Sequence, residues 1–340
     1  MIYRLILALR HLAYDKGWKK TFTAGVPTIG VGNITVGGTG KTPHTELILR
    51  RLLQSDRWAY ANLAVLSRGY KRSSRGFQVV SRDSTAAFAG DEPLQIARKF
   101  PVVTVAVDKN RVRGCEKLMA DNHARLIVLD DAFQYRKLSA TLNVVLVDWN
   151  RPVYQDKLLP WGRLRDFPSR LQKAHIVLVT KCPAEVDDWT RQEWRRRLKL
   201  SAAQQLFFTT VAYNAPEPVF PEADPRYTYS QRLVLVSGIA NNAPLRSYLS
   251  DTYKIAQRLD FPDHHRFTRA DIRRLRAAVR ENPTACLMTT EKDAQRLRDV
   301  HKVPPEVRQR LFFLPIEARF LTPEEDRLFT ETLLQAVECK

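Results

Sequence analysis

A short glycine-rich segment near the start of the chain combines the residue types that bind phosphate. Its consecutive residues are Gly37, Gly38, Thr39, Gly40, Lys41 and Thr42. Glycines let backbone N–H groups approach phosphate oxygens, the lysine can reach the outer phosphates, and the threonine hydroxyl can hold Mg²⁺. The first glycine of the usual phosphate-loop pattern is replaced by Thr35. We expect nucleotide-phosphate binding here, with a purely structural glycine turn as the alternative.

Two consecutive acidic residues, Asp130 and Asp131, follow four aliphatic residues at positions 126–129. Carboxylates at the end of a buried strand beside a phosphate loop can bind Mg²⁺ directly or through water. One aspartate at such a place could simply cap the next turn. Two in succession favour a metal role for at least one of them.

Several other segments carry more polar chemistry than their surroundings require. They cover residues 66–70, 90–93, 130–135, 158–166, 261–265 and 290–294. Taken singly, each has a simpler interpretation. Asp91 could cap the helix that follows it, and His264 could bond a backbone carbonyl. Arg165 and Asp166 could form a solvated pair.

The elements that must position these residues follow from the apolar pattern. Continuous aliphatic runs, typical of parallel strands covered on both faces, predict strands at 28–35, 63–67, 102–107, 126–129, 143–147 and 176–180. Helical patterns separate several of them, for example at 92–99 and 109–121. Repeated strand-then-helix units predict an α/β fold with a doubly wound, mostly parallel sheet of the P-loop NTPase type.

A chain of 340 residues is long enough for two domains. We expect a core domain over residues 21–208 and a proline-rich linker over 209–232. A second, smaller α/β domain is expected over residues 233–340. In that domain the pattern predicts strands at 233–236, 285–289 and 311–315 and helices at 244–249 and 272–279. The last predicted helix, 323–337, could pack back on the core domain.

Residues 1–20 are predicted to form an amphipathic helix. Apolar residues recur at helical spacing from Ile2 to Ala13, and Lys16, Lys19 and Lys20 follow. The helix could pack on its own domain, or it could lie in a membrane interface with its lysines at the level of the headgroups. Both could hold together.

The charge balance narrows the class of partner. The chain has 55 Lys and Arg against 36 Asp and Glu, a net charge of +19, which favours nucleic acid, phosphorylated substrates or acidic lipid headgroups. Four scattered cysteines without a C-x-x-C pair argue against a disulfide framework and a thiolate metal site. No apolar run approaches the ~18 residues of a spanning helix. We therefore expect a protein of the cytoplasm or of the cytoplasmic face of a membrane.

Taken in order behind the phosphate loop, the polar segments resemble one family. G-D-E-P at 90–93, D-D-A-F-Q-Y at 130–135 and D-H at 263–264 are similar to the motifs of tetraacyldisaccharide 4′-kinase, the lipid A kinase of Gram-negative bacteria. The resemblance runs from the N-terminal helix to Ala294. It implies transfer of the γ-phosphate of ATP to the 4′-hydroxyl of tetraacyldisaccharide 1-phosphate, which gives lipid IVA. It also implies a monotopic protein on the cytoplasmic face of the inner membrane, with the active site between two α/β/α domains.

The resemblance assigns roles residue by residue. Lys41 would stabilise charge on the transferred phosphoryl group. Asp91 matches the catalytic carboxylate and His264 its histidine partner, so that closure of the two domains would assemble the base. Thr42, Glu92, Asp130 and Asp131 match positions near Mg²⁺. Arg68, Arg111, Gln134, Arg165 and Asp166 match positions that face the headgroup of the lipid.

The implied ligands are ATP, Mg²⁺ and a glycolipid, with peripheral membrane contact, no nucleic acid and no obligate protein partner. Ala132 and Tyr135 depart from the glycine and histidine that are usual at these positions, and Asp166 stands where glutamate is more frequent. Ala132 requires a turn that avoids positive φ.

Two other classes of protein share part of this pattern. A dimeric P-loop ATPase that works as a switch shares the glycine-rich loop, but its members carry a lysine where this chain has Val36. A nucleic-acid-binding NTPase would suit the positive charge. The basic residues are spread along the chain without aromatic interleaving, which counts against that class.

Overall fold

Nine strands form the larger of two main sheets in the computed structural model, which describes residues 2–338. Their order is β16-β10-β9-β8-β2-β6-β3-β5-β4. The bounds are β2 Thr28–Asn33, β3 Leu63–Ser67, β4 Gln78–Val79, β5 Thr104–Val107, β6 Leu126–Asp130, β8 Leu142–Asp148, β9 Ile176–Thr180, β10 Gln205–Tyr213 and β16 Ile316–Phe320. Only the pairings of β4 with β5 and of β10 with β16 are antiparallel.

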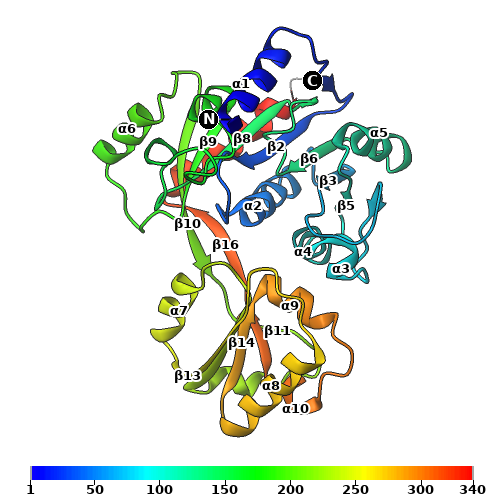
Figure 1. Cartoon of the computed structure of the whole chain (residues 1–340), viewed down its shortest axis with the longest axis vertical. Helices are drawn as coiled ribbons and strands as arrows, with labels where there is room; N and C mark the ends of the chain where they lie inside the picture. Colours follow the sequence, from blue (N-terminus) through cyan, green and yellow to red (C-terminus); the bar gives the residue numbers. More distant parts are fainter. Residues whose placement is uncertain (1, 339–340) are drawn as a thin grey trace.

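Helices cover both faces of this sheet because the side chains of a strand alternate between the two faces. On one face, α2 (Lys41–Leu53), α4 (Asp91–Lys99) and α11 (Pro323–Glu338) pack against the sheet. On the other face lie α5 (Arg111–Asp121) and α6 (Asp188–Arg197). The predicted doubly wound, mostly parallel α/β fold is confirmed (Figure 1).

The smaller domain contains a five-stranded sheet of order β11-β15-β14-β12-β13. Its strands are β11 Glu217–Pro218, β12 Arg232–Ser237, β13 Lys254–Asp260, β14 Cys286–Thr290 and β15 Leu311–Leu314. Helices α8 (Arg269–Glu281), α9 (Glu291–Arg298) and α10 (Pro305–Arg308) pack on one face, and α7 (Ala243–Ser250) packs on the other. The second, smaller α/β domain is therefore present as expected.

Two strands connect the domains. β10 leaves the large sheet toward the smaller domain, and β16 returns antiparallel to it (Figure 1). The expected boundary at 208/209 falls inside β10, which continues to Tyr213, and the expected linker also contains β11. Val219 and Phe220 of the proline-rich segment are buried in the core of the smaller domain, so part of the expected linker belongs to that domain. Helix α11 packs on the core domain, where Phe329, Leu333 and Val337 are fully buried.

Helices α4 of the core domain and α9 of the smaller domain form a further contact between the two domains, and α3 (Ala86–Ala89) also contacts α9. It contains Arg98 Nη1, which donates to Gln295 Oε1 at 2.5 Å, and Lys99 Nζ, which lies 3.0 Å from Glu291 Oε1. The remaining α-helices and strands are α1 (Ile2–Asp15), β1 (Phe22–Thr23) and β7 (Leu138–Ser139). Short 3-10 helices cover Val153–Gln155, Pro168–Lys173 and Pro225–Tyr229.

Candidate active site

The glycine-rich segment lies between β2 and α2, as the phosphate-loop pattern requires. Gly40 stands at the N-cap of α2 with φ +87°, a conformation that side chains rarely adopt. Asn33 Nδ2 donates to Thr39 Oγ1 at 2.6 Å, and Lys181 Nζ donates to the Gly38 carbonyl at 2.5 Å. The loop is thus held at Gly38 and Thr39, and the free N–H groups at the start of α2 can bind an anion.

His44, one turn into α2, connects the phosphate loop to strand β10. Its Nδ1 lies 2.7 Å from the carbonyl oxygen of Gly40, and its Nε2 lies 2.8 Å from Thr209 Oγ1 on β10. Because a carbonyl can only accept, Nδ1 carries a proton here and Nε2 accepts from the hydroxyl. Burial lowers the pKa of His44 to about 4. The imidazole therefore connects the phosphate loop to the strand that leads to the smaller domain.

The two consecutive aspartates differ in environment. Asp130, at the end of β6, is buried, and its Oδ2 accepts from Ser67 Oγ at 3.0 Å. Burial and the nearby Glu92 and Asp131 carboxylates raise the pKa of Asp130 to about 7. Asp130 Oδ1 has no hydrogen-bond partner among the residues that the structure describes.

Asp131 adopts a left-handed backbone conformation, φ +49°, so Ala132 can keep a negative φ in this turn. Lys41 Nζ lies 3.8 Å from Asp131 Oδ1, and Arg165 bonds both carboxylate oxygens of Asp131. Although burial opposes the shift, Lys41 and Arg165 lower the pKa of Asp131 to about 2. The phosphate-loop lysine is thus held beside an ionised carboxylate.

Asp91 and His264 come from different domains and meet. Gly90 precedes α4 with φ +94°, which places Asp91 as the first residue of that helix. His264, in the loop after β13, also has a left-handed conformation, φ +61°. His264 Nδ1 lies 3.1 Å from Asp91 Oδ2. Although burial opposes the shift, hydrogen bonds from His264 and Arg296 hold the pKa of Asp91 below its ordinary value.

A second charged pair crosses between the domains beside the first. Glu92 of α4 forms an ion pair with Lys292 of α9. The charge of Lys292 lowers the pKa of Glu92, and Lys41 adds to this effect. Three carboxylates (Glu92, Asp130 and Asp131) and two lysines therefore influence one another near the phosphate loop, and an entering phosphate meets a mixed, partly balanced charge distribution.

The five residues expected to face the headgroup do not form one continuous patch of free side chains. Arg68 is exposed after β3, whereas Arg111 is buried at the start of α5 and stacks at 5.1 Å on the ring of Tyr135. Gln134 donates to the backbone oxygen of Asn33. Arg165 also donates to Asn33 Oδ1 at 2.5 Å, so both residues are attached to the end of β2.

Asp166 is directed toward the N-terminal helix. Its side chain is buried, and Oδ1 lies 2.7 Å from Nε2 of His11 on α1. Tyr3 Oη also donates to the carbonyl of Arg165 at 2.9 Å, and Arg10 donates to the carbonyl of Gln134 at 2.6 Å. The helix is therefore attached through polar contacts to the two segments that were expected to bind the headgroup.

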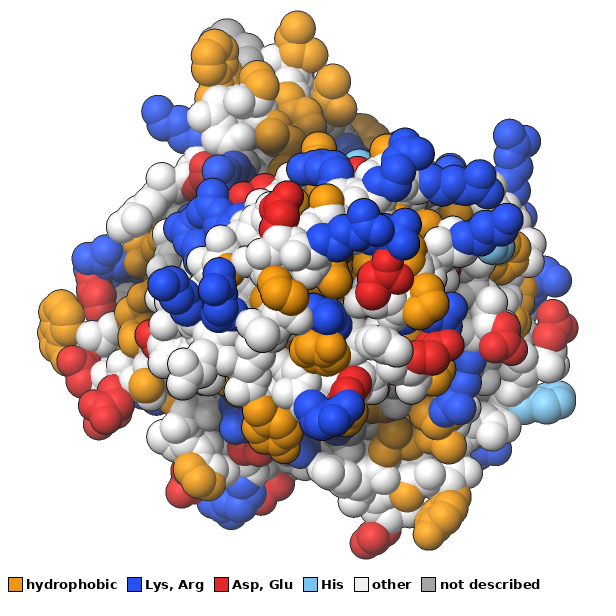
Figure 2. All heavy atoms as spheres, turned by 90° about the horizontal axis from the view of Figure 1, so that it is seen from below, with side chains coloured by type: hydrophobic (Ala, Val, Ile, Leu, Met, Phe, Trp, Pro, Cys, Tyr) orange, Lys and Arg blue, Asp and Glu red, His pale blue; other side chains and the backbone are white. Residues whose placement is uncertain are grey.

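Attached in this way, α1 keeps its apolar side chains outward. Ile2, Leu5, Ile6, Leu9 and Leu12 are each at least 42% exposed. In Figure 2, hydrophobic side chains gather on the projection at the top of the view, with Lys and Arg side chains on the surface below it. Among residues 2–338, no helix is long and apolar enough to cross a membrane.

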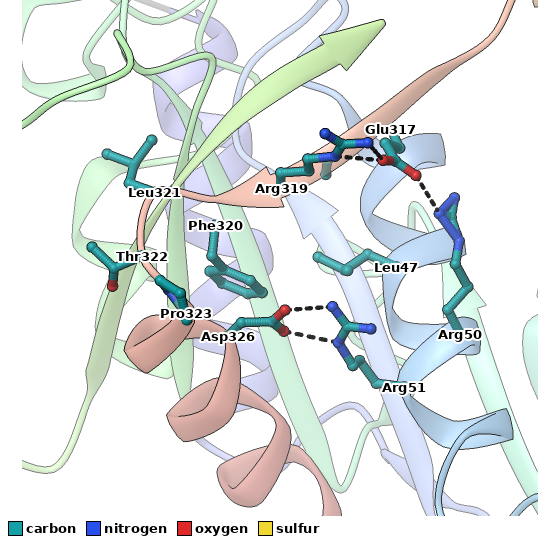
Figure 3. Close-up of a pocket in the computed structure, with 11 residues that line it drawn as sticks. Leu47, Arg50, Arg51, Glu317, Arg319, Phe320, Leu321, Thr322, Pro323 and Asp326 are labelled. Carbon is teal, nitrogen blue, oxygen red and sulfur yellow. Dashed lines mark hydrogen bonds and ion pairs between the residues drawn. The ribbon is translucent and has the colours of Figure 1, made fainter. Parts of the chain in front are cut away.

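A pocket of about 370 Å³ lies elsewhere in the core domain, between α2, β16 and α11 (Figure 3). Three ion pairs line it: Arg51 with Asp326, Arg50 with Glu317 at 3.2 Å, and Arg319 with Glu317. It contains none of the residues expected in the active site. The ion pairs of Arg50 and Arg51 connect the phosphate-loop helix to the returning C-terminal segment, which is a structural role.

Sequence reasoning missed two residues that the geometry places at the centre of the site. Asn33 bonds the phosphate loop and Arg165, and Arg296 bonds Asp91. Asn33 ends an apolar run, and a single amide side chain at that place did not indicate a functional role. Arg296 lies on α9, one turn after Asp293, and prediction of that helix would have aligned it with the residues of segment 290–294.

Known proteins similar to this chain belong to the family that its motifs resemble. Residues 1–338 match the family described as tetraacyldisaccharide-1-P 4′-kinase. A tetraacyldisaccharide 4′-kinase of Parabacteroides distasonis is 40% identical, over 100% of this chain and 93% of its own length. That of Phocaeicola vulgatus is 38% identical, over 99% and 93%.

Among solved structures, LpxK from Aquifex aeolicus, in an "apo" form described as in complex with ATP, matches with a TM-score of 0.75 and 26% identity. The match covers 99% of this chain and 96% of that chain. The family match and the curated relatives extend over nearly the whole chain. The chain therefore belongs to the tetraacyldisaccharide 4′-kinase family and is an ATP-dependent kinase of lipid A biosynthesis.

Proposed function

We propose that the chain transfers the γ-phosphate of ATP to the 4′-hydroxyl of tetraacyldisaccharide 1-phosphate, with Asp91 and His264 accepting the proton of that hydroxyl. The observation that carries this proposal is the 3.1 Å contact between Asp91 Oδ2 and His264 Nδ1, made between two domains. A carboxylate beside an imidazole is a suitable general base, because the carboxylate orients the ring and stabilises its protonated form.

The reaction balances with the groups present. The 4′-oxygen forms a bond to the γ-phosphorus while the bond from that phosphorus to the β–γ bridging oxygen breaks, and ADP leaves. The hydroxyl proton passes to the Asp91–His264 pair. Lys41, at the start of α2, stabilises negative charge on the transferred group, and the loop of residues 37–42 holds the other phosphates through its N–H groups.

The residues near the loop fit a magnesium ion. Asp130 has a buried carboxylate oxygen without a hydrogen-bond partner in the described chain, beside Asp131 and Glu92. Among residues 2–338, no three or more His, Cys, Asp or Glu side chains are grouped to hold a metal by themselves. Mg²⁺ usually takes only one or two carboxylates and completes its shell with phosphate and water. Thr42 and one or two of the Glu92, Asp130 and Asp131 carboxylates would hold it, and it would neutralise charge on the phosphates.

The lipid headgroup would lie where the segments around Gln134 and Arg165 meet α1. The exposed guanidinium of Arg68 can donate to phosphate oxygens. Arg111 and Arg165 add positive charge beside it, while their terminal donors are held by Asp131, by Asn33 and by backbone carbonyls. Asp166 acts here by holding His11, and hence the helix, rather than by touching the lipid. The outward apolar side of α1 would then enter the lipid surface on the cytoplasmic face of the bacterial inner membrane.

The first experiment tests the reaction. Purified protein is incubated in mixed micelles with Mg²⁺, γ-labelled ATP and tetraacyldisaccharide 1-phosphate, with Lys41→Ala as the control. We expect label in a bis-phosphorylated lipid, and its loss in the control. Consumption of ATP without labelled lipid would contradict the proposal.

The second experiment tests the membrane contact. Flotation with vesicles that contain an anionic phospholipid compares the wild type with Leu5→Gln/Leu9→Gln and with Leu328→Gln, an exposed leucine of α11. Loss of two leucines from the outward apolar face of α1 should weaken binding about tenfold or more. The α11 variant should bind as the wild type does. Equal binding by all three proteins would exclude α1 as the contact.

A further inference from the structure

Arg296 lies between the two members of the proposed base and touches both. Its Nε donates to Asp91 Oδ2 at 2.9 Å, and its Nη2 bonds the same oxygen. Nη2 also lies 3.2 Å from His264 Nδ1. One side chain of the smaller domain therefore contacts the carboxylate of the core domain and the histidine of its own domain.

The smaller domain fixes the orientation of this guanidinium. Arg296 Nη1 donates to Asp293 Oδ1 at 2.8 Å and to the Gly238 carbonyl at 3.2 Å. Asp293 is itself held, because its Oδ2 accepts from the Gly238 N–H and from Thr290 Oγ1, both at 2.8 Å. The Arg296 side chain is only 6% exposed. Its remaining donors are thus aimed at Asp91 before any substrate arrives.

This arrangement makes the two oxygens of Asp91 unequal. Oδ2 receives both arginine contacts and the histidine contact, whereas Oδ1 forms no hydrogen bond with any residue in the described part of the chain. The Asp91 side chain is 14% exposed. Oδ1 is therefore the oxygen that is left free to accept a hydrogen bond from a substrate hydroxyl.

We propose that Arg296 is a positioning residue for phosphoryl transfer, which locks Asp91 against His264 across the domain boundary and leaves Asp91 Oδ1 for the acceptor hydroxyl. The inference rests on the proposed function of the Asp91–His264 pair. It adds a part that the pair alone lacks, a rigid connection between the domains at the reacting atoms. A guanidinium suits this role because its planar fork can contact several acceptors in fixed directions, whereas an ammonium is a single point charge.

The test measures kcat and the KM for ATP with tetraacyldisaccharide 1-phosphate as acceptor. The variants are Arg296→Met, Arg296→Lys, Asp91→Asn and the double variant Arg296→Met/Asp91→Asn. Arg298→Met is the matched control, since Arg298 is on the same helix but donates to the carbonyls of Pro218 and Val219. Thermal melting of every variant reports on folding.

We expect Arg296→Met to lower kcat by about tenfold to a hundredfold, part of the roughly 10²–10⁴-fold that general acid–base catalysis supplies. The KM for ATP should change little, because no phosphate-loop contact is lost. Arg296→Lys should recover part of the loss. In the Asp91→Asn background the Arg296→Met change should cost almost nothing more, because the arginine acts through that carboxylate.

Three results would overturn the inference: kcat of Arg296→Met equal to that of Arg298→Met, losses that multiply in the double variant, or a kcat loss in proportion to a lowered melting temperature. If Arg296→Met does not fold, Arg296→Lys, which keeps the charge beside Asp293, decides the question by the same comparison, and full kcat there would also overturn it. Failure of the proposed function would look different, since the wild type itself would then leave the lipid unlabelled.

Discussion

Acidification should destabilise the core domain through one buried histidine, His44. Its pKa is about 4 in the folded chain, against an ordinary value near 6.5, because burial disfavours the charged imidazole. The unfolded chain therefore binds a proton between these values that the folded chain does not. The contribution of His44 to the free energy of unfolding is fully present above about pH 6.5 and is lost as the pH falls toward 4.

The size of the effect follows from the shift. At about 1.4 kcal/mol per pKa unit, the full loss is about 3 kcal/mol, of which about 2 kcal/mol is already lost at pH 5. Other groups titrate in the same range with the opposite sign. The pKa of Glu291, for example, is raised to about 7 by burial. The measurement must therefore compare two proteins at each pH.

The assay is urea denaturation followed by tryptophan fluorescence between pH 4.5 and 7.5 at constant ionic strength, for the wild type and His44→Asn. The amide can still donate to the Gly40 carbonyl but does not titrate. The free energy of unfolding of the wild type minus that of His44→Asn should fall by about 2 kcal/mol from pH 7.5 to pH 5. His301→Asn, at an exposed histidine, is the control and should show no such trend. Parallel profiles for wild type and His44→Asn would refute the reasoning.

Two further substitutions test the packing. Lys99 Nζ lies 2.8 Å from the fully buried carboxylate of Glu46 and also pairs with Glu291 of the other domain. Lys99→Met removes this shared cation and should lower the free energy of unfolding by about 3 kcal/mol. A change in the urea midpoint worth less than about 0.5 kcal/mol would instead class these ion pairs with weak surface contacts. Phe329→Ala removes a fully buried ring whose centre lies 5.7 Å from that of Phe207. It should lower the free energy of unfolding by about 3–5 kcal/mol and speed amide hydrogen exchange in α11. Unchanged exchange would show that α11 does not depend on this contact.

Much of the core domain could be predicted because its strands are long, continuous aliphatic runs. The predicted strands at 63–67 and 176–180 coincide with β3 and β9. Elements with weak apolar patterns were missed. β16 alternates apolar and charged residues at the sheet edge, and α9 buries its polar residues as well as Ala294 and Leu297. Tertiary contacts rather than local pattern determine such segments.

The same limit applies to the candidate site. Contiguous motifs made Asp91, Lys41 and the consecutive aspartates candidates, because several unusual residues stand together; their roles stay predictions. Arg296 was missed, because helix α9 was not predicted and because its contact with Asp91 forms only when α4 and α9 meet across the domain boundary. Asp166 was expected at the headgroup, and its contact with His11 depends on where α1 packs, which the amphipathic pattern left open.

The single-turnover rate of phosphoryl transfer to the lipid tests the central claim most directly, measured for Asp91→Asn, His264→Gln and the double variant at saturating ATP. If the two side chains form one base across the domains, each single variant should lose about 10²–10⁴-fold, and the double variant should be about as slow as the slower single one. Nucleotide binding should be unchanged in all three. Wild-type turnover in either single variant, or losses that multiply in the double variant, would contradict the account.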